Sequence, residues 1–257
     1  MSSRLSERVC IITGTGGSIG REAARTFARE GAMVVGCDLT VDAAQATVEM
    51  VRAAEGTMVS LQPCHLTKPA DCQALVDFAV STFGRIDVLF NNAAMAYFNW
   101  IEDISDDEWD RDRREEVDLV FYLTRAAWPH LKTSRGVVVN TGSLNGLLSF
   151  KTLPSLAHTT AKAGVIAIDA AARDGGARVW DSRQLDLARP DRDEPDARAA
   201  EGPRVGSCDA RQDVARPSWP ARGGGERRYV FGLGREFVRD WRRHRRRWRY
   251  ESLVIYV

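Results

Sequence analysis

The chain has 257 residues, of which 44% are hydrophobic and 28% are charged, close to the averages of globular proteins. This composition excludes a wholly disordered or fibrous protein and allows one sizeable domain, or two small ones, with a hydrophobic core. No apolar run approaches the roughly 20 residues of a membrane span. Residues 1–7 contain no apolar segment, so we expect no secretory signal.

The cysteines are scattered, odd in number and without a CxxC pair. They are Cys10, Cys37, Cys64, Cys72 and Cys208. This pattern favours a reducing cytoplasm and argues against a disulfide framework or a zinc site.

The net charge of +1 conceals two parts of different composition. Residues 1–167 hold 16 basic and 20 acidic residues, whereas residues 168–257 hold 20 arginines, 15 acidic residues and no Lys, Thr, Asn or Met. The sequence therefore predicts a domain over residues 1–167, followed by an anomalous Arg-rich segment over residues 168–257.

Residues 1–167 alternate between strand and helix patterns. Short apolar runs predict strands over residues 9–13, 33–37, 57–62, 86–90 and 136–140. Helical spacing predicts helices over residues 18–30, 41–54 and 70–83, one or two helices over 106–132, and another that begins at 157. This alternation predicts an α/β fold with a parallel sheet that helices cover on both faces.

A glycine-rich turn, Thr13-Gly14-Thr15-Gly16-Gly17-Ser18-Ile19-Gly20, separates the first strand from the first helix. Such a turn lets the backbone and the helix N-terminus approach a pyrophosphate, although it also occurs as an ordinary tight loop. Asp38 ends the next strand, where a carboxylate can hold ribose hydroxyls. A carboxylate there repels the 2′-phosphate of NADP, and residues 14–20 contain no Lys or Arg, so NAD is the expected cofactor.

Over about residues 8–168 the chain resembles the short-chain dehydrogenase/reductase family of Rossmann-fold oxidoreductases. The TGxxxGxG turn of the family matches residues 13–20, with Ser18 at the middle glycine, and its NNAG motif matches residues 91–94 as Asn-Asn-Ala-Ala. The serine motif matches Ser143-Leu144-Asn145-Gly146. The YxxxK motif ends at Lys162, with His158 at the tyrosine position.

The resemblance implies a Rossmann-like, doubly wound sheet and a set of cofactor-binding residues. These are Gly14, Thr15, Gly17, Ser18, Ile19, Gly20, Asp38, Leu66, Asn92, Ala93 and Lys162. His65 replaces the acidic residue that meets adenine in the family, which leaves the backbone of Leu66 for that contact.

The resemblance also implies that Ser143, His158 and Lys162 are catalytic, in hydride transfer between NAD(H) and a small alcohol or ketone. A free imidazole titrates near ~6.5, and a lysine one helical turn away favours its neutral form. Neutral His158 can accept a proton from an alcohol, so oxidation is the natural direction. The alternative is a protein that binds the cofactor without turnover. Glu116 aligns with the Asn of the family's tetrad, and we expect it to be a structural or solvent-facing helix residue.

The segment from residue 168 onward reads as an out-of-frame translation of the family's second half. Possible codons for residues 181–191, read one base later, give Ile-Arg-Ala-Asn-Ser-Ile-Ser-Pro-Gly-Leu, and those for residues 239–250 give Val-Thr-Gly-Ala-Asp-Ile-Val-Val-Asp-Gly-Gly. Both peptides resemble family motifs and occur in the family's order. We therefore expect an irregular or incomplete C-terminal part that packs weakly, a sheet without its last strands and a cofactor pocket open on the nicotinamide side.

The sequence also bears on the partners of the protein. The family forms homo-oligomers partly through its last strand, and the lack of that strand weakens this expectation for the present chain. Residues 241–247, Trp-Arg-Arg-His-Arg-Arg-Arg, suggest nucleic-acid binding, but they lie in the anomalous segment and we expect no nucleic-acid or membrane partner.

Overall fold

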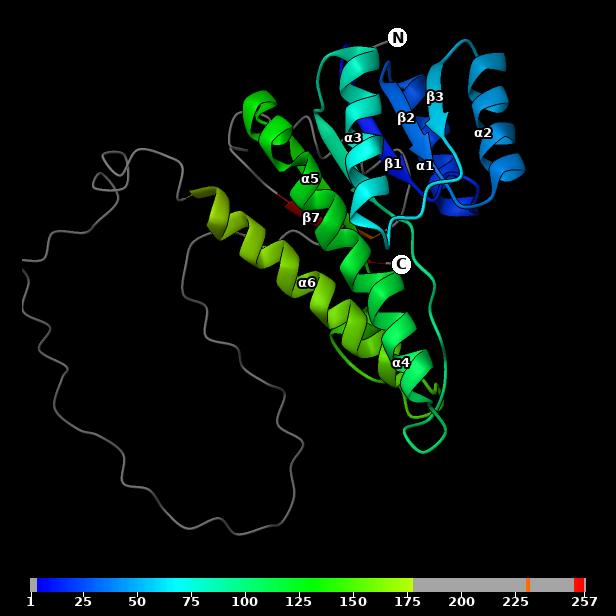
Figure 1. Ribbon diagram of the computed structural model, residues 1–257, viewed down its shortest axis with the longest axis vertical. Coiled ribbons are helices and arrows are strands. Elements are labelled where there is room, and N and C mark those ends of the chain that lie inside the picture. The colour runs from blue at the N-terminus through cyan, green and yellow to red at the C-terminus, as the bar shows by residue number, and fades with distance from the viewer. Residues whose placement is uncertain (1–3, 178–229, 232–251, 257) are drawn as a thin grey trace, which may run out of the picture. The chain divides into compact units, whose positions relative to one another are not determined.

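The computed structural model describes residues 4–177, 230–231 and 252–256, and all of the descriptions below concern these residues (Figure 1). The strands are β1 (Val9–Thr13), β2 (Met33–Cys37), β3 (Thr57–Leu61), β4 (Val88–Asn91), β5 (Val137–Gly142), β6 (Val230–Phe231) and β7 (Ser252–Tyr256). The helices are α1 (Ser18–Arg29), α2 (Val41–Ala53), α3 (Pro69–Phe83), α4 (Asp106–Arg113), the π-helical turn η1 (Arg114–Asp118), α5 (Leu119–Ser134), the 3-10 turn η2 (Leu144–Gly146) and α6 (Leu156–Ala177).

The strands form one sheet in the order β3-β2-β1-β4-β5-β7-β6, and every neighbouring pair is parallel. The chain moves outward from β1 to β3 and then returns to place β4 on the other side of β1. The carboxyl ends of β1 and β4 therefore meet at the point where the strand order reverses, which is where open α/β sheets bind ligands. The predicted doubly wound α/β fold is confirmed.

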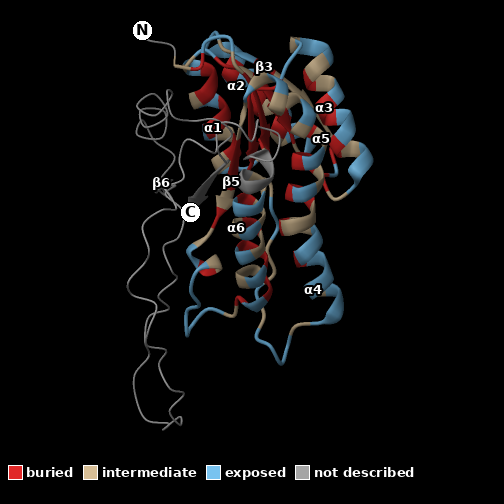
Figure 2. Cartoon of the chain, turned by 90° about the vertical axis from the view of Figure 1, so that its left-hand side faces the viewer, coloured by how far each residue is buried: buried red, intermediate tan, exposed pale blue. Residues whose placement is uncertain are grey.

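Helices cover both faces of this sheet, as the alternation of residues within β1 shows. Val9 and Ile11 belong to the hydrophobic cluster that includes residues of α3, α5 and α6. Cys10 and Ile12 belong to the cluster that includes residues of α1 and α2. Successive side chains of a strand point to opposite faces, so β1 is buried on both sides. Figure 2 shows the strands as a buried layer between helices whose outer surfaces are exposed.

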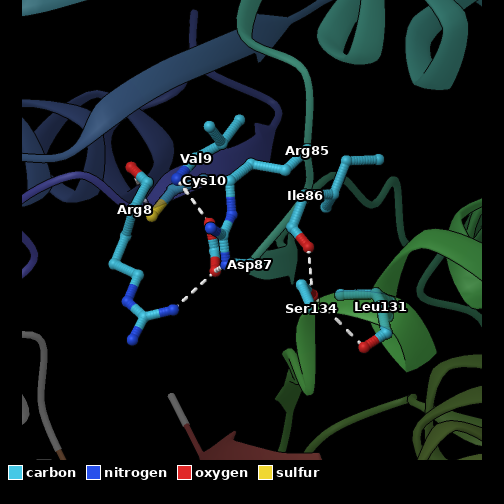
Figure 3. A network of polar contacts seen from close by, with 8 residues as sticks. All are labelled: Arg8, Val9, Cys10, Arg85, Ile86, Asp87, Leu131 and Ser134. Carbon is cyan, nitrogen blue, oxygen red and sulfur yellow. Dashed lines mark hydrogen bonds and ion pairs between the residues drawn. The ribbon is translucent and has the colours of Figure 1, made fainter.

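A buried carboxylate joins the starts of β1 and β4 (Figure 3). Asp87 is 3% exposed, and its Oδ1 accepts hydrogen bonds of 2.6 Å from both Arg8 and Arg85. Its Oδ2 accepts one of 3.1 Å from the N–H of Val9. A buried charge is stable only when it is paired. This network therefore fixes the starts of β1 and β4, the two strands whose carboxyl ends meet at the ligand-binding edge.

The expectation that the sheet lacks its last strands is wrong. β7 pairs with β5 from Val138 opposite Ser252 to Gly142 opposite Tyr256, and β6 pairs with β7. Backbone pairing needs only an extended segment, which residues 252–256 supply although they come from the anomalous part of the sequence. Helix α6 also continues beyond residue 168, to Ala177.

Several expectations lie outside the described residues. They include Cys208, the basic run at residues 241–247, the packing of residues 178–229, and the openness of the pocket. Among the helices that the structure describes, none has the length and apolar character required to span a bilayer.

Candidate active site

The glycine turn brings the start of α1 directly against the end of β1. Gly14 has φ +70°, in the left-handed region that favours glycine, and its N–H donates to the carbonyl of Cys37 at 2.9 Å. A Cβ on Gly20 would lie 2.1 Å from the carbonyl oxygen of Gly14, so this position accepts only glycine without movement of the turn. Gly17 closes the turn with an N–H bond of 3.2 Å to the same oxygen.

The first N–H groups of α1 are available for a ligand. The helix begins at Ser18, and the first backbone bond that reaches back into the turn comes from Arg21, whose N–H donates to Gly17 at 2.9 Å. The N–H groups of Ser18, Ile19 and Gly20 donate to no acceptor in the turn, which lies within the described residues. Unpaired N–H groups and the positive end of the helix dipole suit a pyrophosphate.

The side chain of Thr15, which was predicted to contact the cofactor, forms its hydrogen bond inside the protein. Its side chain is buried, and its hydroxyl donates to the carbonyl of Cys37 at 3.4 Å. Its carbonyl accepts a bond of 2.7 Å from the hydroxyl of Thr47 on α2. Thr15 therefore ties the turn to β2 and α2, and its contact with a cofactor stays a prediction.

Asp38 is fixed beside the turn at the end of β2. Its Oδ2 accepts a bond of 2.8 Å from the N–H of Gly16, and its Oδ1 accepts one of 2.8 Å from the N–H of Thr40. A Cβ on Gly16 would lie 3.0 Å from Oδ2, so the glycine lets turn and carboxylate approach closely. The guanidinium of Arg21 donates to the Gly16 carbonyl at 2.8 Å. The turn, the helix start and the carboxylate together fit the pyrophosphate and ribose of a dinucleotide.

The segment after β4 braces the other side of the turn. The side chain of Asn92 donates to the carbonyl of Thr13 at 2.9 Å. The N–H groups of Asn92 and Ala93 both donate to the hydroxyl of Thr13 at 2.9 Å. Asn91 is buried and donates to Thr124 and Asn140. These residues hold the carboxyl ends of β1, β4 and β5 together.

The segment after β3 lies beside Asp38. The N–H of Cys64 donates to the carbonyl of Asp38 at 2.9 Å. The carbonyl of Leu66 accepts a bond of 3.2 Å from the thiol of Cys72, and the N–H of His65 donates to Asp71 at 2.8 Å. The backbone of Leu66 is thus held near the end of β2, and its contact with adenine stays a prediction.

Ser143 and Lys162 meet at the end of β5. Ser143 caps η2, where its hydroxyl accepts a bond of 3.2 Å from the N–H of Asn145. A Cβ on Gly146 would lie 2.7 Å from the backbone carbon of Lys162, so η2 packs directly on α6. The ammonium of Lys162 donates to the carbonyl of Thr141 at 3.2 Å. The structure therefore brings these two predicted residues together.

Glu116 lies in the site and is buried, so the solvent-facing alternative that the sequence suggested is wrong. Its side chain is 1% exposed, its Oε2 lies 2.8 Å from Nδ1 of His158, and its Oε1 lies 3.2 Å from Nζ of Lys162. Glu116 belongs to η1, the π-helical turn between α4 and α5. A carboxylate and an ammonium that share a buried site compensate each other's charge. The signal in the sequence was the pair of departures from the family's tetrad, His158 and Glu116, which occur together.

A second buried acid lies one turn before Glu116. Asp112 is 1% exposed, and its Oδ2 accepts a bond of 3.0 Å from the N–H of Tyr97. Its Oδ1 has no hydrogen-bond partner among the described residues. Burial raises the pKa of Asp112 to about 6, and the charge of Glu116 acts in the same direction. Sequence reasoning did not find Asp112, because α4 is acidic along most of its length.

An aromatic ring contacts His158, and two loops of the chain carry exposed apolar side chains. The ring of Phe98 lies 5.3 Å from that of His158, centroid to centroid. The loops at residues 94–104 and 144–156 carry large apolar side chains that remain exposed, namely Met95, Phe98, Trp100, Ile101, Leu144, Leu147, Leu148, Phe150, Leu153 and Leu156. A substrate that contacts these loops would meet hydrocarbon surface.

Known proteins match the part of the chain that contains these residues. The family model described as short chain dehydrogenase matches residues 8–178. The chain is 34% identical over 185 residues to cyclohexanol dehydrogenase of Acinetobacter sp. (strain SE19), a match that covers 70% of this chain and 72% of that protein. It is 36% identical over 172 residues to trans-4-hydroxycyclohexanecarboxylate dehydrogenase of Sinomonas cyclohexanicum, with 64% of this chain and 65% of that protein covered.

Among solved structures, the fold is similar to that of a short chain dehydrogenase from Mycobacterium smegmatis, with a TM-score of 0.63 and 29% identity over 68% of this chain and 72% of that chain. The matched residues include the glycine turn, the end of β5 and the first part of α6. The chain therefore belongs to the short-chain dehydrogenase family.

Proposed function

We propose that the chain binds NAD and oxidises the hydroxyl group of a small alcohol. The observation that carries this proposal is the position of Asp38, whose carboxylate is fixed by the N–H of Gly16 directly beside the glycine turn. A carboxylate at this point accepts hydrogen bonds from ribose hydroxyls and repels a 2′-phosphate. No basic residue stands next to Asp38 in the sequence to offset that repulsion.

The residues at the end of β5 supply the proton transfer. Bound NAD would accept a hydride from the carbon that carries the hydroxyl. The hydroxyl of Ser143 would hydrogen-bond the substrate oxygen, and neutral His158 would accept the proton of the alcohol. Lys162 would hold the ribose next to the nicotinamide and supply a positive charge to the site.

We propose an apolar alcohol as the substrate class. The exposed apolar side chains of the two loops and the ring of Phe98 beside His158 support this choice. Two relatives are named for a cyclohexanol and a hydroxycyclohexanecarboxylate. A ring alcohol would bury hydrocarbon against these loops while its hydroxyl meets His158.

Cofactor titration tests the proposed preference for NAD over NADP. NAD should bind more tightly than NADP, and Asp38→Ala should narrow the ratio of the two dissociation constants by about tenfold, or roughly 1.4 kcal/mol. Asp42→Ala is the matched control, because Asp42 is an exposed acid on α2 whose side chain forms no hydrogen bond with the turn among the described residues. Equal affinities in the unaltered protein contradict the proposal.

A second candidate function is cofactor binding without turnover. His158 at the tyrosine position favours it, because imidazole is a weaker match to the family's chemistry than the tyrosine–lysine pair. A panel of ring and short-chain alcohols, assayed for NADH formation, separates the two. Turnover of any member supports the oxidoreductase, whereas tight NAD binding with no turnover supports the second candidate.

We further propose that residues 168–257 are translated out of frame, which would lower the activity of this chain. The composition of the segment and the two shifted peptides support this reading. The nucleotide sequence around the codon of Ile168 tests it, and early stop codons in the shifted frame would contradict it.

The cysteines that the structure describes are free and buried, which supports a location in the reducing cytoplasm.

A further inference from the structure

The strongest unexplained feature of the site is a single carboxylate that contacts two basic side chains, one through each of its oxygens. Glu116 presents Oε2 to Nδ1 of His158 at 2.8 Å and Oε1 to Nζ of Lys162 at 3.2 Å. The side chains of Glu116, His158 and Lys162 are 1%, 13% and 6% exposed. The contact joins η1 to α6 across 42 residues of sequence, so it is set by tertiary packing.

The charges in this cluster favour an ionised Glu116. Burial of a carboxylate is costly unless a positive charge lies beside it, and Lys162 supplies that charge. Lys162 also donates to the carbonyl of Thr141, which holds its ammonium in place. The titratable groups that face His158 are Glu116 from η1, Lys162 from its own helix and Asp112 from α4, and the ring of Phe98 covers it from the loop at residues 94–104.

An ionised carboxylate only accepts hydrogen bonds. The short contact with Oε2 therefore requires a proton on Nδ1 of His158. In the neutral imidazole the lone pair is then on Nε2. Among the described residues, Nε2 has no hydrogen-bond partner.

We propose that Glu116 is a positioning residue, which holds His158 in the tautomer that has a free base at Nε2. The inference rests on the proposed function, since it assigns this nitrogen as the acceptor of the alcohol proton. In the step, the O–H bond of the alcohol breaks as the proton passes to Nε2. Bound NAD would accept the hydride that the C–H bond releases, which would leave a carbonyl compound, NADH and an imidazolium at position 158. Glu116 remains ionised and stabilises that imidazolium through Nδ1.

This assignment gives the two charged neighbours of His158 opposite effects. The ammonium of Lys162 would repel a second positive charge at position 158. Glu116 offsets the positive charge when it forms. A histidine with the lysine alone would be a poor acceptor, so the carboxylate at position 116 makes the histidine at position 158 chemically useful.

The tautomer can be measured on the full chain without substrate or NAD. Nitrogen-15 NMR of histidine-labelled protein distinguishes a protonated Nδ1 from a protonated Nε2, and His158→Ala identifies which of the four histidines gives the signal. We expect neutral His158 to carry its proton on Nδ1. A proton on Nε2 in the unaltered protein overturns the inference, and this measurement needs no variant of Glu116.

Glu116→Gln tests the charge while it keeps the size of the side chain. The pH at which the His158 signal titrates should fall by about one unit, because the imidazolium loses an adjacent carboxylate. In turnover, kcat should fall about 100-fold with little change in KM or in NAD affinity. Glu115→Gln is the matched control, since Glu115 lies on the same π-helical turn but bonds the hydroxyl of Tyr97 at 2.8 Å. An unchanged titration in Glu116→Gln overturns the inference.

The outcomes separate the inference from the proposed function. The expected tautomer and titration, without NAD binding or turnover, would contradict the proposed function and leave the hydrogen-bond assignment standing. NAD-dependent turnover with the proton on Nε2 would contradict the inference alone.

Discussion

The two sides of the site are built from different atoms. On the glycine-turn side, backbone N–H and carbonyl groups take part in every contact described above for residues 13–20 and 92–93, and the charged side chains of Asp38 and Arg21 bind this backbone. On the other side, at the end of β5 and the start of α6, the side chains of Glu116, His158 and Lys162 form the contacts. A turn built from backbone tolerates few changes, because space decides which residue fits. A cluster of side chains can accept substitutions that keep its polar groups hydrogen-bonded and its buried charges compensated.

The largest expected effect is the loss of turnover in His158→Ala. General acid–base catalysis contributes about 100- to 10,000-fold, so the rate should fall by that factor while NAD affinity stays within about twofold. The rate of the unaltered protein should also fall at low pH as the imidazole protonates. Steady-state kinetics and NAD titration measure the two properties separately.

His130→Ala is the control for this variant, because His130 lies on α5 away from the cluster. A His158→Ala protein with an unchanged rate would show that the proton goes elsewhere. Loss of NAD affinity in the same variant would show that the two sides of the site are not independent.

The next largest effect should be the cost of a methyl group on Gly20. Its Cβ would lie 2.1 Å from the carbonyl oxygen of Gly14, whereas a Cβ on Gly17 would lie 3.5 Å from the same atom, an ordinary contact. We expect Gly20→Ala to lower the free energy of unfolding by about 3 kcal/mol, and Gly17→Ala to change it by less than about 1 kcal/mol. Denaturant titration of the two variants gives the comparison. Equal losses would mean that space in the turn is not the deciding factor.

The smallest effect should be a stabilisation that depends on pH. The pKa of Asp112 is raised from 3.8 to about 6, mainly by burial. The folded protein therefore holds this proton more tightly than the unfolded chain does, and the free energy of unfolding falls as the pH rises from about 4 to about 6. Asp112→Asn removes this penalty. The free energy of unfolding of the variant should exceed that of the unaltered protein by about 1–2 kcal/mol at pH 7.5 and should be nearly equal to it at pH 4. A pKa shift of this size can change stability by at most about 3 kcal/mol.

Asp110→Asn provides the comparison for Asp112→Asn. Asp110 lies on the same helix with its side chain 59% exposed, and its loss should change stability by less than about 0.5 kcal/mol. A gain from Asp112→Asn that is the same at both pH values would contradict burial of the charged form as the cause.

Much of the fold could be predicted from local patterns. The first strand was expected at residues 9–13 and is found there, and the helix expected at 18–30 is found at Ser18–Arg29. Apolar runs and glycine stops report on neighbours in sequence, which is why these elements were recovered. The region expected as one or two helices over 106–132 contains α4, the π-helical turn and α5. The extra residue of a π-helical turn leaves no periodic signal of its own.

The position of Glu116 could not be read from its own surroundings. Two adjacent glutamates on a charged helix are typical of a solvent-facing surface, and the partner that changes this reading is 42 residues away. The strand at residues 252–256 was missed for a related reason. Composition showed that the segment departs from the family, but pairing depends on the backbone of β5 and not on ancestry. Both errors come from contacts between parts that are distant in sequence.

The pairing of β7 with β5 has a consequence for the behaviour of the protein in solution. The outer side of β5 carries a row of backbone donors and acceptors, and from Val138 to Gly142 residues 252–256 cover it. A strand side without a partner is a template on which other chains can add. Residues 252–256 therefore shield the pairing side of β5. A chain that ends before residue 252 should form edge-to-edge oligomers even if its cofactor site is intact.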